Sequence, residues 1–478
     1  MTSQEEKFIL SIVKLEDEHL ENNLETYSVE KYLNDEFSFN IHDENIFTKV
    51  YYVLQKALTE GILEVFIKNN ILTDKLEVKD LVAFDATRFI KLVLEVLNLK
   101  LLSKKEAWGL LFLNASRIQD TFKNAEEFKT SYFKGALFYD ILFKSEEDNR
   151  GEKIQNFDAL FKDLYDASKV KLFWLEGEVF KALNIEESSS NLVSKDLVQN
   201  DENSNEPQIT SMYKLLKKED KTELWKLLDN FSQEERNKFL NHLYIDKKEQ
   251  IEILTAEDYL ELPARYPDVS YAHYLRGIYF YHFAWEARGL GLTNTVGQKN
   301  YALFYERLRY ARTDLKRAYE LSPNEQTYWA ELYNLVKHFR GKDSDQIEEE
   351  LYARIKKDAM QNTFCIKRVS HMKKARWGGS HTESLNWARE VVADSPQGNY
   401  NKIIIFEVLI EQSNYILEFD RNEEKANAIF KNKVLQNEVN QYFDELIANI
   451  AEAPLSLKST LIFWYEKVGD LARLQKIL

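Results

Sequence analysis

Residues 317–324 read Arg-Ala-Tyr-Glu-Leu-Ser-Pro-Asn, and residues 389–397 read Arg-Glu-Val-Val-Ala-Asp-Ser-Pro-Gln. Each stretch ends an amphipathic pattern at a Ser-Pro pair, and proline does not continue a helix. The two Ser-Pro pairs lie 73 residues apart, or two units of about 36 residues. This recurrence predicts helix pairs that stack on their neighbours.

A unit of this length is close to the roughly 34-residue tetratricopeptide repeat, in which each helix pair buries its apolar face against the next. The composition agrees, because the 478 residues include only 14 Gly and 6 Pro, the residues that punctuate strands and turns. We expect an all-α protein with an N-terminal helical bundle and a C-terminal tetratricopeptide-like α-superhelix. The repeat spacing is irregular upstream of Tyr301 and after Gly398.

A domain boundary is predicted at residues 186–207. This segment has no aromatic residue and carries six acids against one base among several Ser and Asn. Such a composition cannot bury enough apolar surface to offset its ordering entropy. We therefore expect an N-terminal helical domain over residues 1–185, an acidic flexible linker over 186–207, and a tetratricopeptide-like helical-repeat domain over 208–478.

Local patterns place individual helices. Ser103 and Glu106 have the spacing of a capping box, which predicts a helix from Lys104 onward. Apolar residues at three- and four-residue spacing predict a helix over residues 46–66, and further helices are expected over 299–321 and 382–393.

Charge and apolar content restrict the class of protein. The net charge of −15 disfavours binding to nucleic acid or to an anionic membrane, and is compatible with a basic protein partner. The most apolar stretch, residues 89–102, is interrupted by charges and cannot span a bilayer. The first residues are polar and acidic, and Cys365 is the only cysteine, so we expect a cytoplasmic protein with a buried, inert thiol.

The charge is unevenly distributed, which suggests two candidate binding regions. The first 50 residues hold twelve acids against four lysines, whereas residues 366–381 carry five bases and no acid. Both regions are also compatible with solvated helix faces. The acidic docking candidates are Glu16, Asp17, Glu18, Glu21 and Glu25. The partner- or anion-binding candidates are Arg288, Lys367, Arg368, Lys373, Lys374, Arg376, Trp377 and Ser380.

Two glycine-containing turns accompany these candidates. Trp377-Gly-Gly-Ser380 joins two helices, and Ser380 with Glu383 predicts an N-cap for the second. Its glycines permit close approach of the backbone to a neighbouring helix or to a ligand. Arg288 precedes Gly289 at a predicted helix end, where it can pair with a carboxylate or with free carbonyls.

Residues that could support catalysis form no complete motif. Asp85 and Arg88 have i, i+3 spacing and are expected to form a structural ion pair that fixes bundle register. The eight histidines show no metal-binding spacing, and no nucleophile motif is present. We expect no catalytic residue, no metal and no cofactor.

The N-terminal part resembles a known family. Residues 83–88 (Ala-Phe-Asp-Ala-Thr-Arg), 106–108 (Glu-Ala-Trp), 125–128 (Ala-Glu-Glu-Phe) and 132–135 (Tyr-Phe-Lys-Gly) occur in one order. This order resembles the bacterial domain of unknown function 1266 family. Asn124-Ala125 replaces the Ser-Trp that usually precedes the Glu-Glu-Phe.

The C-terminal part resembles a second family. Tyr266-Pro267, residues 285–291 (Trp-Glu-Ala-Arg-Gly-Leu-Gly), residues 318–323 and residues 377–380 occur in the order found in the tetratricopeptide-like domain of unknown function 4034 family. The two resemblances imply a bacterial origin and a helical fold, and neither implies an activity.

These observations favour a non-catalytic protein-binding protein. In the sharper form of this hypothesis, the chain is a cytosolic immunity protein (an antitoxin) that binds and neutralises a basic bacterial toxin. The alternatives are a helical scaffold or adaptor, and a small-ligand sensor or enzyme with a pocket near Arg288 and Trp377. We expect neither nucleic acid nor a membrane as a partner.

Overall fold

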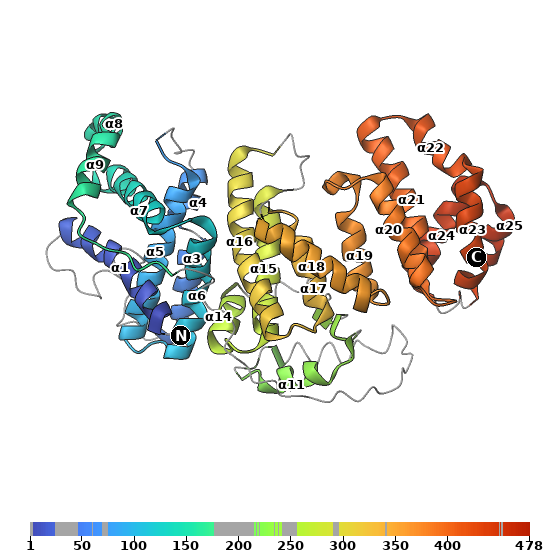
Figure 1. Ribbon diagram of the computed structural model, residues 1–478, viewed down its shortest axis with the longest axis horizontal. Helices are drawn as coiled ribbons and strands as arrows, with labels where there is room; N and C mark the ends of the chain where they lie inside the picture. Colours follow the sequence, from blue (N-terminus) through green and yellow to red (C-terminus); the bar gives the residue numbers. More distant parts are fainter. Residues whose placement is uncertain are drawn as a thin grey trace. The chain divides into compact units, whose positions relative to one another are not determined.

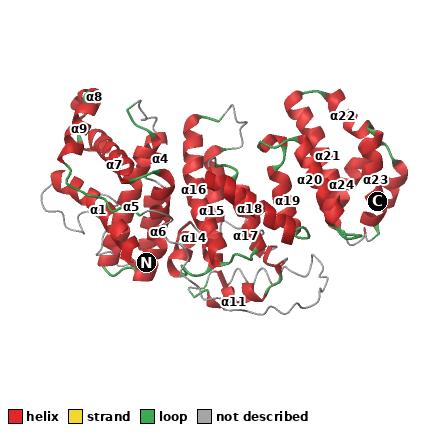
Figure 2. Cartoon of the chain, viewed as in Figure 1, coloured by secondary structure: helices red, strands yellow, loops and turns green. Residues whose placement is uncertain are grey.

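The structure is a computed structural model. It describes residues 3–23, 46–59, 61–68, 75–175, 215–216, 218, 220–233, 235–237, 239–240, 256–289, 296–339, 342–448, 450 and 453–478. All regular elements in these ranges are helices, which confirms the expected all-α class (Figure 2). Among the described helices, none combines the length and the apolar character needed to cross a membrane.

The chain divides into two compact units, Met1–Pro323 and Asn324–Leu478. Figure 1 labels the helices and colours them by residue number. This division differs from the predicted boundary, because the helices of residues 256–321 belong to the same compact unit as the N-terminal helices, with α14 packed on α6 and α3. The proposed linker, residues 186–207, lies outside the described residues.

The first unit is built around α5, whose side chains are buried along most of its length. A capping box of Glu77 and Asp80 starts this helix. The predicted capping box of Ser103 and Glu106 is also present and starts α6. The elements of this unit are α1 (Ser3–Asn23), α3 (Ile46–Thr59), α4 (Ile62–Lys68), α5 (Val78–Asn98), α6 (Lys104–Thr121), α7 (Ala125–Tyr139), η1 (Asp140–Lys144), α8 (Glu147–Gln155), α9 (Phe157–Ala167), α11 (Thr222–Asn230), α14 (Ala256–Arg265), α15 (Ser270–Arg288) and α16 (Gln298–Leu321).

Two glycines allow helices of the first unit to approach closely. A Cβ atom on Gly135 of α7 would lie 2.4 Å from the carbonyl oxygen of Asp80 at the start of α5. A Cβ atom on Gly109 of α6 would lie 2.2 Å from the carbonyl oxygen of Pro263 in α14. The second contact joins α14 directly to α6, and α15 and α16 pack against each other beside it.

The second unit consists of consecutive helices that pack on one another. The central helix α17 is buried along its whole length and contacts both α18 and α19. Helix α20 packs on α21, and α21 packs on α22 and α24. The elements of this unit are α17 (Gln326–Val336), α18 (Lys342–Asp358), α19 (Thr363–Met372), η2 (Ala375–Trp377), α20 (His381–Asp394), η3 (Tyr400–Ile403), α21 (Ile404–Tyr415), η4 (Ile416–Asp420), α22 (Glu423–Lys431), α23 (Lys433–Ile447), α24 (Leu455–Val468) and α25 (Leu471–Ile477).

Three helix starts in the second unit recur at a constant interval. The N-cap residues Glu325, Asn362 and Asn399 lie 37 residues apart and precede α17, α19 and η3. In each case a side-chain oxygen of the cap accepts a hydrogen bond from the backbone N–H two residues later. The interval is close to the spacing of about 36 residues inferred from the Ser-Pro pairs.

Candidate functional site

A polar cavity lies inside the first unit, between α3, α4, α5, α6, α15 and α16. Its volume is about 20 Å³. Carboxylates, guanidinium groups, an amide and a phenol line it together with apolar side chains. The polar lining residues are Thr59, Glu64, Asp85, Asn114, Arg117, Glu306, Arg307 and Tyr310.

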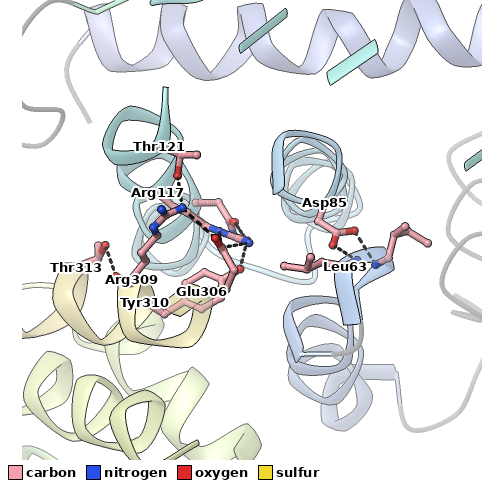
Figure 3. Close-up of polar contacts among 10 residues, drawn as sticks. Leu63, Asp85, Arg117, Thr121, Glu306, Arg309, Tyr310 and Thr313 are labelled. Carbon is pink, nitrogen blue, oxygen red and sulfur yellow. Dashed lines mark hydrogen bonds and ion pairs between the residues drawn. The ribbon is translucent and has the colours of Figure 1, made fainter. Parts of the chain in front are cut away.

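Asp85 reaches this cavity from α5 and caps the first turn of α4. Its two carboxylate oxygens accept hydrogen bonds from the backbone N–H groups of Ile62 (2.8 Å) and Leu63 (2.9 Å) (Figure 3). Burial raises the pKa of Asp85, while these two hydrogen bonds and the positive charge of Arg88 oppose the rise.

The structure gives the Asp85 carboxylate other hydrogen-bond partners than the predicted one, Arg88. The hydrogen bonds of Asp85 go to the backbone of α4, since that helix start brings two free amides to the carboxylate. The guanidinium of Arg88 lies 5.3 Å and 5.1 Å from the ring centres of Phe84 and Tyr139. Arg88 thus acts on Asp85 through its charge, and Asp85 fixes the position of α4.

Arg117 of α6 forms the centre of a second buried cluster. Its Nε and Nη2 donate to Oε2 of Glu306 in α16, at 3.0 Å and 2.6 Å, and its Nη1 donates to the Tyr310 hydroxyl (Figure 3). The other Glu306 oxygen accepts from Arg309 at 2.9 Å. Burial raises the pKa of Tyr310, so its hydroxyl stays protonated. This cluster connects helices that are far apart in the sequence.

Arg307 makes the third polar link across the cavity. Its Nη2 donates to Glu64 of α4 at 2.6 Å, and its Nη1 donates to the carbonyl of Phe283 at 2.8 Å. The side chains of Arg307 and Glu64 are about 10 % exposed or less. A nearby fully buried pair, Arg276 with Asp314, joins α15 to α16 at 2.7 Å and 2.9 Å.

These clusters support packing better than catalysis. A cavity of about 20 Å³ has room for roughly one water molecule. Its guanidinium groups are bound to carboxylates and carbonyls, as buried charges require. Within the described residues, no group of three His, Cys, Asp or Glu side chains is placed to hold a metal ion. The sequence analysis missed Asn114, Arg117 and Glu306, although a lone arginine within the apolar face of α6 is a detectable signal.

The acidic docking candidates are largely engaged within the chain. Glu16 is 2 % exposed and accepts a hydrogen bond from the Tyr132 hydroxyl at 2.6 Å. Asp17 pairs with Lys91 at 2.5 Å. The prediction is wrong for Glu16, because α1 packs this side of its surface against α5 and α7.

Of the remaining acidic candidates, the structure describes the side chain of Glu18. The carboxylate of Glu18 accepts from Ser168 Oγ at 2.5 Å and from the backbone N–H of Lys169 at 2.8 Å. The side chain of Glu21 and the whole of Glu25 lie outside the described residues. The acidity of the N-terminal stretch therefore serves in part to hold α1 to its own unit.

Arg288 lies at the end of α15, as the sequence predicts. Its Nη1 donates to the carbonyl of Gly289 at 3.1 Å, and its guanidinium lies 5.2 Å from the Trp285 ring. Gly289 has φ of +74°, a conformation that favours glycine. These contacts agree with a helix-terminating role for Arg288.

The basic run of residues 366–381 lies in the second unit, where four of its five cations face carboxylates of the same unit. Arg368 pairs with Glu331 at 2.6 Å, and Arg376 pairs with Glu411 at 2.6 Å. The looser pairs are Lys374 with Glu411 at 3.8 Å and Lys367 with Glu407 at 3.9 Å.

Lys373 differs from these four cations. Its Nζ lies 4.5 Å from the centre of the Tyr352 ring, and among the described residues it has no ion pair. Burial lowers the pKa of Lys373, and the nearby Lys337 lowers it further. The carboxylates of Glu383, Glu390 and Glu348 act in the opposite direction on this pKa, so acidic side chains of the same unit lie within electrostatic range of Lys373.

The Trp-Gly-Gly-Ser turn is explained by packing within the unit. A Cβ atom on Gly379 would lie 2.2 Å from the carbonyl oxygen of Lys373, so the close approach is to the end of α19. Ser380 caps α20 by accepting from the N–H of Glu383 at 3.1 Å, as predicted. The ring of Trp377 lies 5.2 Å from that of His371.

A row of aromatic side chains, half-buried at His381 and Tyr415 and exposed at Phe419, borders this turn and was not predicted. His381 contacts Tyr415 at 5.0 Å between ring centres, and Tyr415 stacks on Phe419 at 4.5 Å. The guanidinium of Arg376 lies 5.7 Å from the Phe419 ring. The π-helical turn η4 presents Leu417 and Phe419 to solvent, at 43 % and 40 % exposure. We call these five residues the π-turn surface; the Tyr-x-x-x-Phe spacing on the helix was its only sequence signal.

Comparisons with known proteins bear on the first unit. Residues 14–174 match the family model described as "Protein of unknown function (DUF1266)". This span begins within α1 and continues beyond α9, and it includes Asp85, Asn114 and Arg117. No curated protein and no solved structure matched the chain. The resemblance proposed for the C-terminal part stays a prediction. Residues 14–174 are thus similar to a family whose description names no activity.

Proposed function

We propose that this chain is a non-catalytic protein-binding protein whose second unit carries the docking surface. The observation that supports this most directly is the π-turn surface, where stacked aromatic rings, an exposed leucine and an arginine lie together. Aromatic residues and arginine are enriched at binding hot spots, because they bury large areas at a low cost in conformational entropy. π-Helical turns also occur frequently at functional sites.

The repeat geometry supports the same proposal. The constant interval between the caps Glu325, Asn362 and Asn399 fits helix pairs stacked as a tetratricopeptide-like superhelix. Such stacks bind partners on extended surfaces. Lys373, whose Nζ lies over the ring of Tyr352 and has no ion pair among the described residues, would meet an acidic group of the partner.

The proposed partner is another protein. A more specific form of the proposal also assigns a role to this chain. With a net charge of −15, the chain would be steered toward a basic protein over long range, while the π-turn surface would supply the short-range contacts. In this version the chain is a bacterial, cytoplasmic immunity protein that neutralises a toxin. In the alternative version, the chain is a scaffold or adaptor that binds a partner through the same surface but neutralises no toxin.

The reading as a small-ligand sensor or enzyme requires a shared pocket near Arg288 and Trp377. These residues belong to different compact units. The described contacts of Arg288 are to the carbonyl of Gly289 and to the rings of Trp285 and Tyr301, and that of Trp377 is to the ring of His371. These described contacts are compatible with packing.

The docking proposal can be tested with paired variants of the tagged full-length chain. Leu417→Ser with Phe419→Ser removes the exposed apolar contacts, whereas Val434→Ser changes a 74 % exposed side chain on α23, outside the π-turn surface. In affinity purification from the native host, a partner should be retained by the wild type and by Val434→Ser and lost with the double variant. Equal recovery with all three proteins would refute the docking surface.

The immunity version has its own test. A toxin-like gene adjacent to this one should encode a protein that arrests growth when it is expressed alone. Co-expression of this chain should restore growth, and co-expression of the Leu417→Ser, Phe419→Ser variant should not. If the wild type fails to rescue growth, the adaptor version remains and the immunity version is excluded.

A further inference from the structure

Asn114 of α6 is a fully buried amide with one half of its hydrogen-bonding capacity unused. It is 0 % exposed, and its Oδ1 accepts from Nη1 of Arg117 at 3.4 Å. Its Nδ2 has no hydrogen-bond partner among the described residues, and Asn114 lines the cavity of the first unit. A buried donor without an acceptor is costly, so each such group in a folded protein needs an explanation.

The same cavity contains the acceptors that this donor lacks. Each oxygen of Asp85 accepts one backbone N–H and retains a further lone pair. Glu64, Glu306 and the Tyr310 hydroxyl also line the space. The cavity volume of about 20 Å³ exceeds the minimum of roughly 10–15 Å³ that a water molecule needs.

The chemistry of the lining selects among ligands of this size. A cation cannot accept the hydrogen bond that Asn114 Nδ2 offers. A halide ion can accept it, but the guanidinium groups of the lining already pair with Glu306 and Glu64, and the carboxylate of Asp85 would repel it. A water molecule accepts from the amide and donates to the carboxylates, so it matches both kinds of group.

We propose that the cavity is a binding site for one ordered water molecule, which accepts a hydrogen bond from Asn114 Nδ2 and donates to the carboxylate lining. This water completes the polar contacts between the family-matched segment, which contains α4, α5 and α6, and the helices α15 and α16. It therefore belongs to the folded state in the way that a buried side chain does.

A crystal structure of the full-length chain, soaked in bromide and at a resolution that shows ordered waters, tests the site directly. We expect one peak within hydrogen-bonding distance of Asn114 Nδ2, with the density of an oxygen atom and no anomalous signal. A bromide anomalous peak at that position would show an anion site, and a cavity without density would show a dry one. Either result would overturn the proposal.

A solution measurement with matched variants gives an independent test. Oxygen-17 relaxation dispersion counts long-lived internal waters, and Asn114→Leu should remove one of them and lower the Tm. The control is Ser413→Ala, which deletes a buried hydroxyl that already donates to the carbonyl of Ala426 at 3.3 Å and should leave the count unchanged. An unchanged count in Asn114→Leu, with an equal or higher Tm, would mean that the amide had no water partner.

Discussion

The two units use charge in different ways. The first unit contains buried ion pairs that join residues far apart in the sequence: Arg117 with Glu306 and Arg307 with Glu64 have side chains about 10 % exposed or less. In the second, Arg389 with Glu438 and Arg376 with Glu411 are at least one-fifth exposed on both sides. Buried pairs add conformational specificity at a high desolvation cost, whereas exposed pairs contribute little. The difference implies that charges select the helix arrangement in the first unit and that caps and aromatic packing do so in the second.

The largest effect should follow from Arg276→Met. Arg276 and Asp314 are 0 % exposed, so the variant leaves a buried carboxylate without its guanidinium. Removing one member of a buried pair typically costs about 3–5 kcal/mol of unfolding free energy. Chemical denaturation measures the loss, and the double variant Arg276→Met, Asp314→Leu should recover part of it. A loss comparable to that of an exposed pair would contradict the contrast between the units.

A smaller loss of unfolding free energy is expected from Gly109→Ala. The added methyl group would lie 2.2 Å from the Pro263 carbonyl oxygen, so α6 and α14 would have to separate. Overpacking of this kind costs about 1–3 kcal/mol. Gly151 in α8 is the matched control, because nothing lies within 4 Å of the position that a Cβ atom would take there. Gly151→Ala should instead raise stability by about 0.5–1 kcal/mol through helix propensity. Similar shifts in Tm for both variants would argue against the close contact of α6 with α14.

A pH effect is expected in the second unit at His371. Burial, followed by the charges of Lys374 and Arg368, lowers the pKa of His371 from 6.5 to about 4. The unfolded chain then binds a proton at a higher pH than the folded chain does, so stability should fall as the pH drops from 6.5 to 4. His371→Gln should reduce the pH dependence of the unfolding free energy by the amount that corresponds to binding about one proton. Urea denaturation between pH 4 and 6.5 measures this pH dependence. An NMR titration that gives His371 a pKa near 6.5 in the folded chain would contradict the lowered pKa.

The smallest effect should come from Arg389→Gln. Its pair with Glu438 has a short distance of 2.6 Å, yet the side chain of Arg389 is 46 % exposed. Exposed pairs contribute roughly 0–1 kcal/mol, and salt screens them. The variant should unfold within about 1 kcal/mol of the wild type, with a difference that shrinks at high salt. A loss as large as that of Arg276→Met would remove the distinction between the two units.

Local features of the fold were predictable from the sequence. The expected helices over residues 299–321 and 382–393 correspond to α16 and α20, within one residue at each end. The caps at Ser103 and Ser380 were also predictable, because they depend on side chains three residues apart. These elements are encoded by short-range hydrogen bonds and by apolar spacing.

Long-range contacts were not predictable in the same way. Asp85 bonds to amides 22 and 23 residues earlier, and Arg307 pairs with a glutamate 243 residues away. No spacing rule connects such positions in a single sequence. The boundary predicted at residues 186–207 rested on composition alone. The packing of α14 on α6 instead joins the helices after this segment to the first unit. The cavity residues were missed for the same reason, since Asn114 and Glu306 meet only in the folded chain.

The caps at Asn362 and Asn399 each use both ends of one amide. Their oxygens start α19 and η3, while their nitrogens donate to the side-chain oxygens of Gln326 (2.8 Å) and Gln361 (3.2 Å) in the preceding turn. A 37-residue segment thus carries both its own start and its attachment to the segment before it. In evolution, duplication or loss of one such segment would leave every helix start capped and every turn attached. Related chains should therefore differ in length by whole segments in this region, and rarely by a few residues.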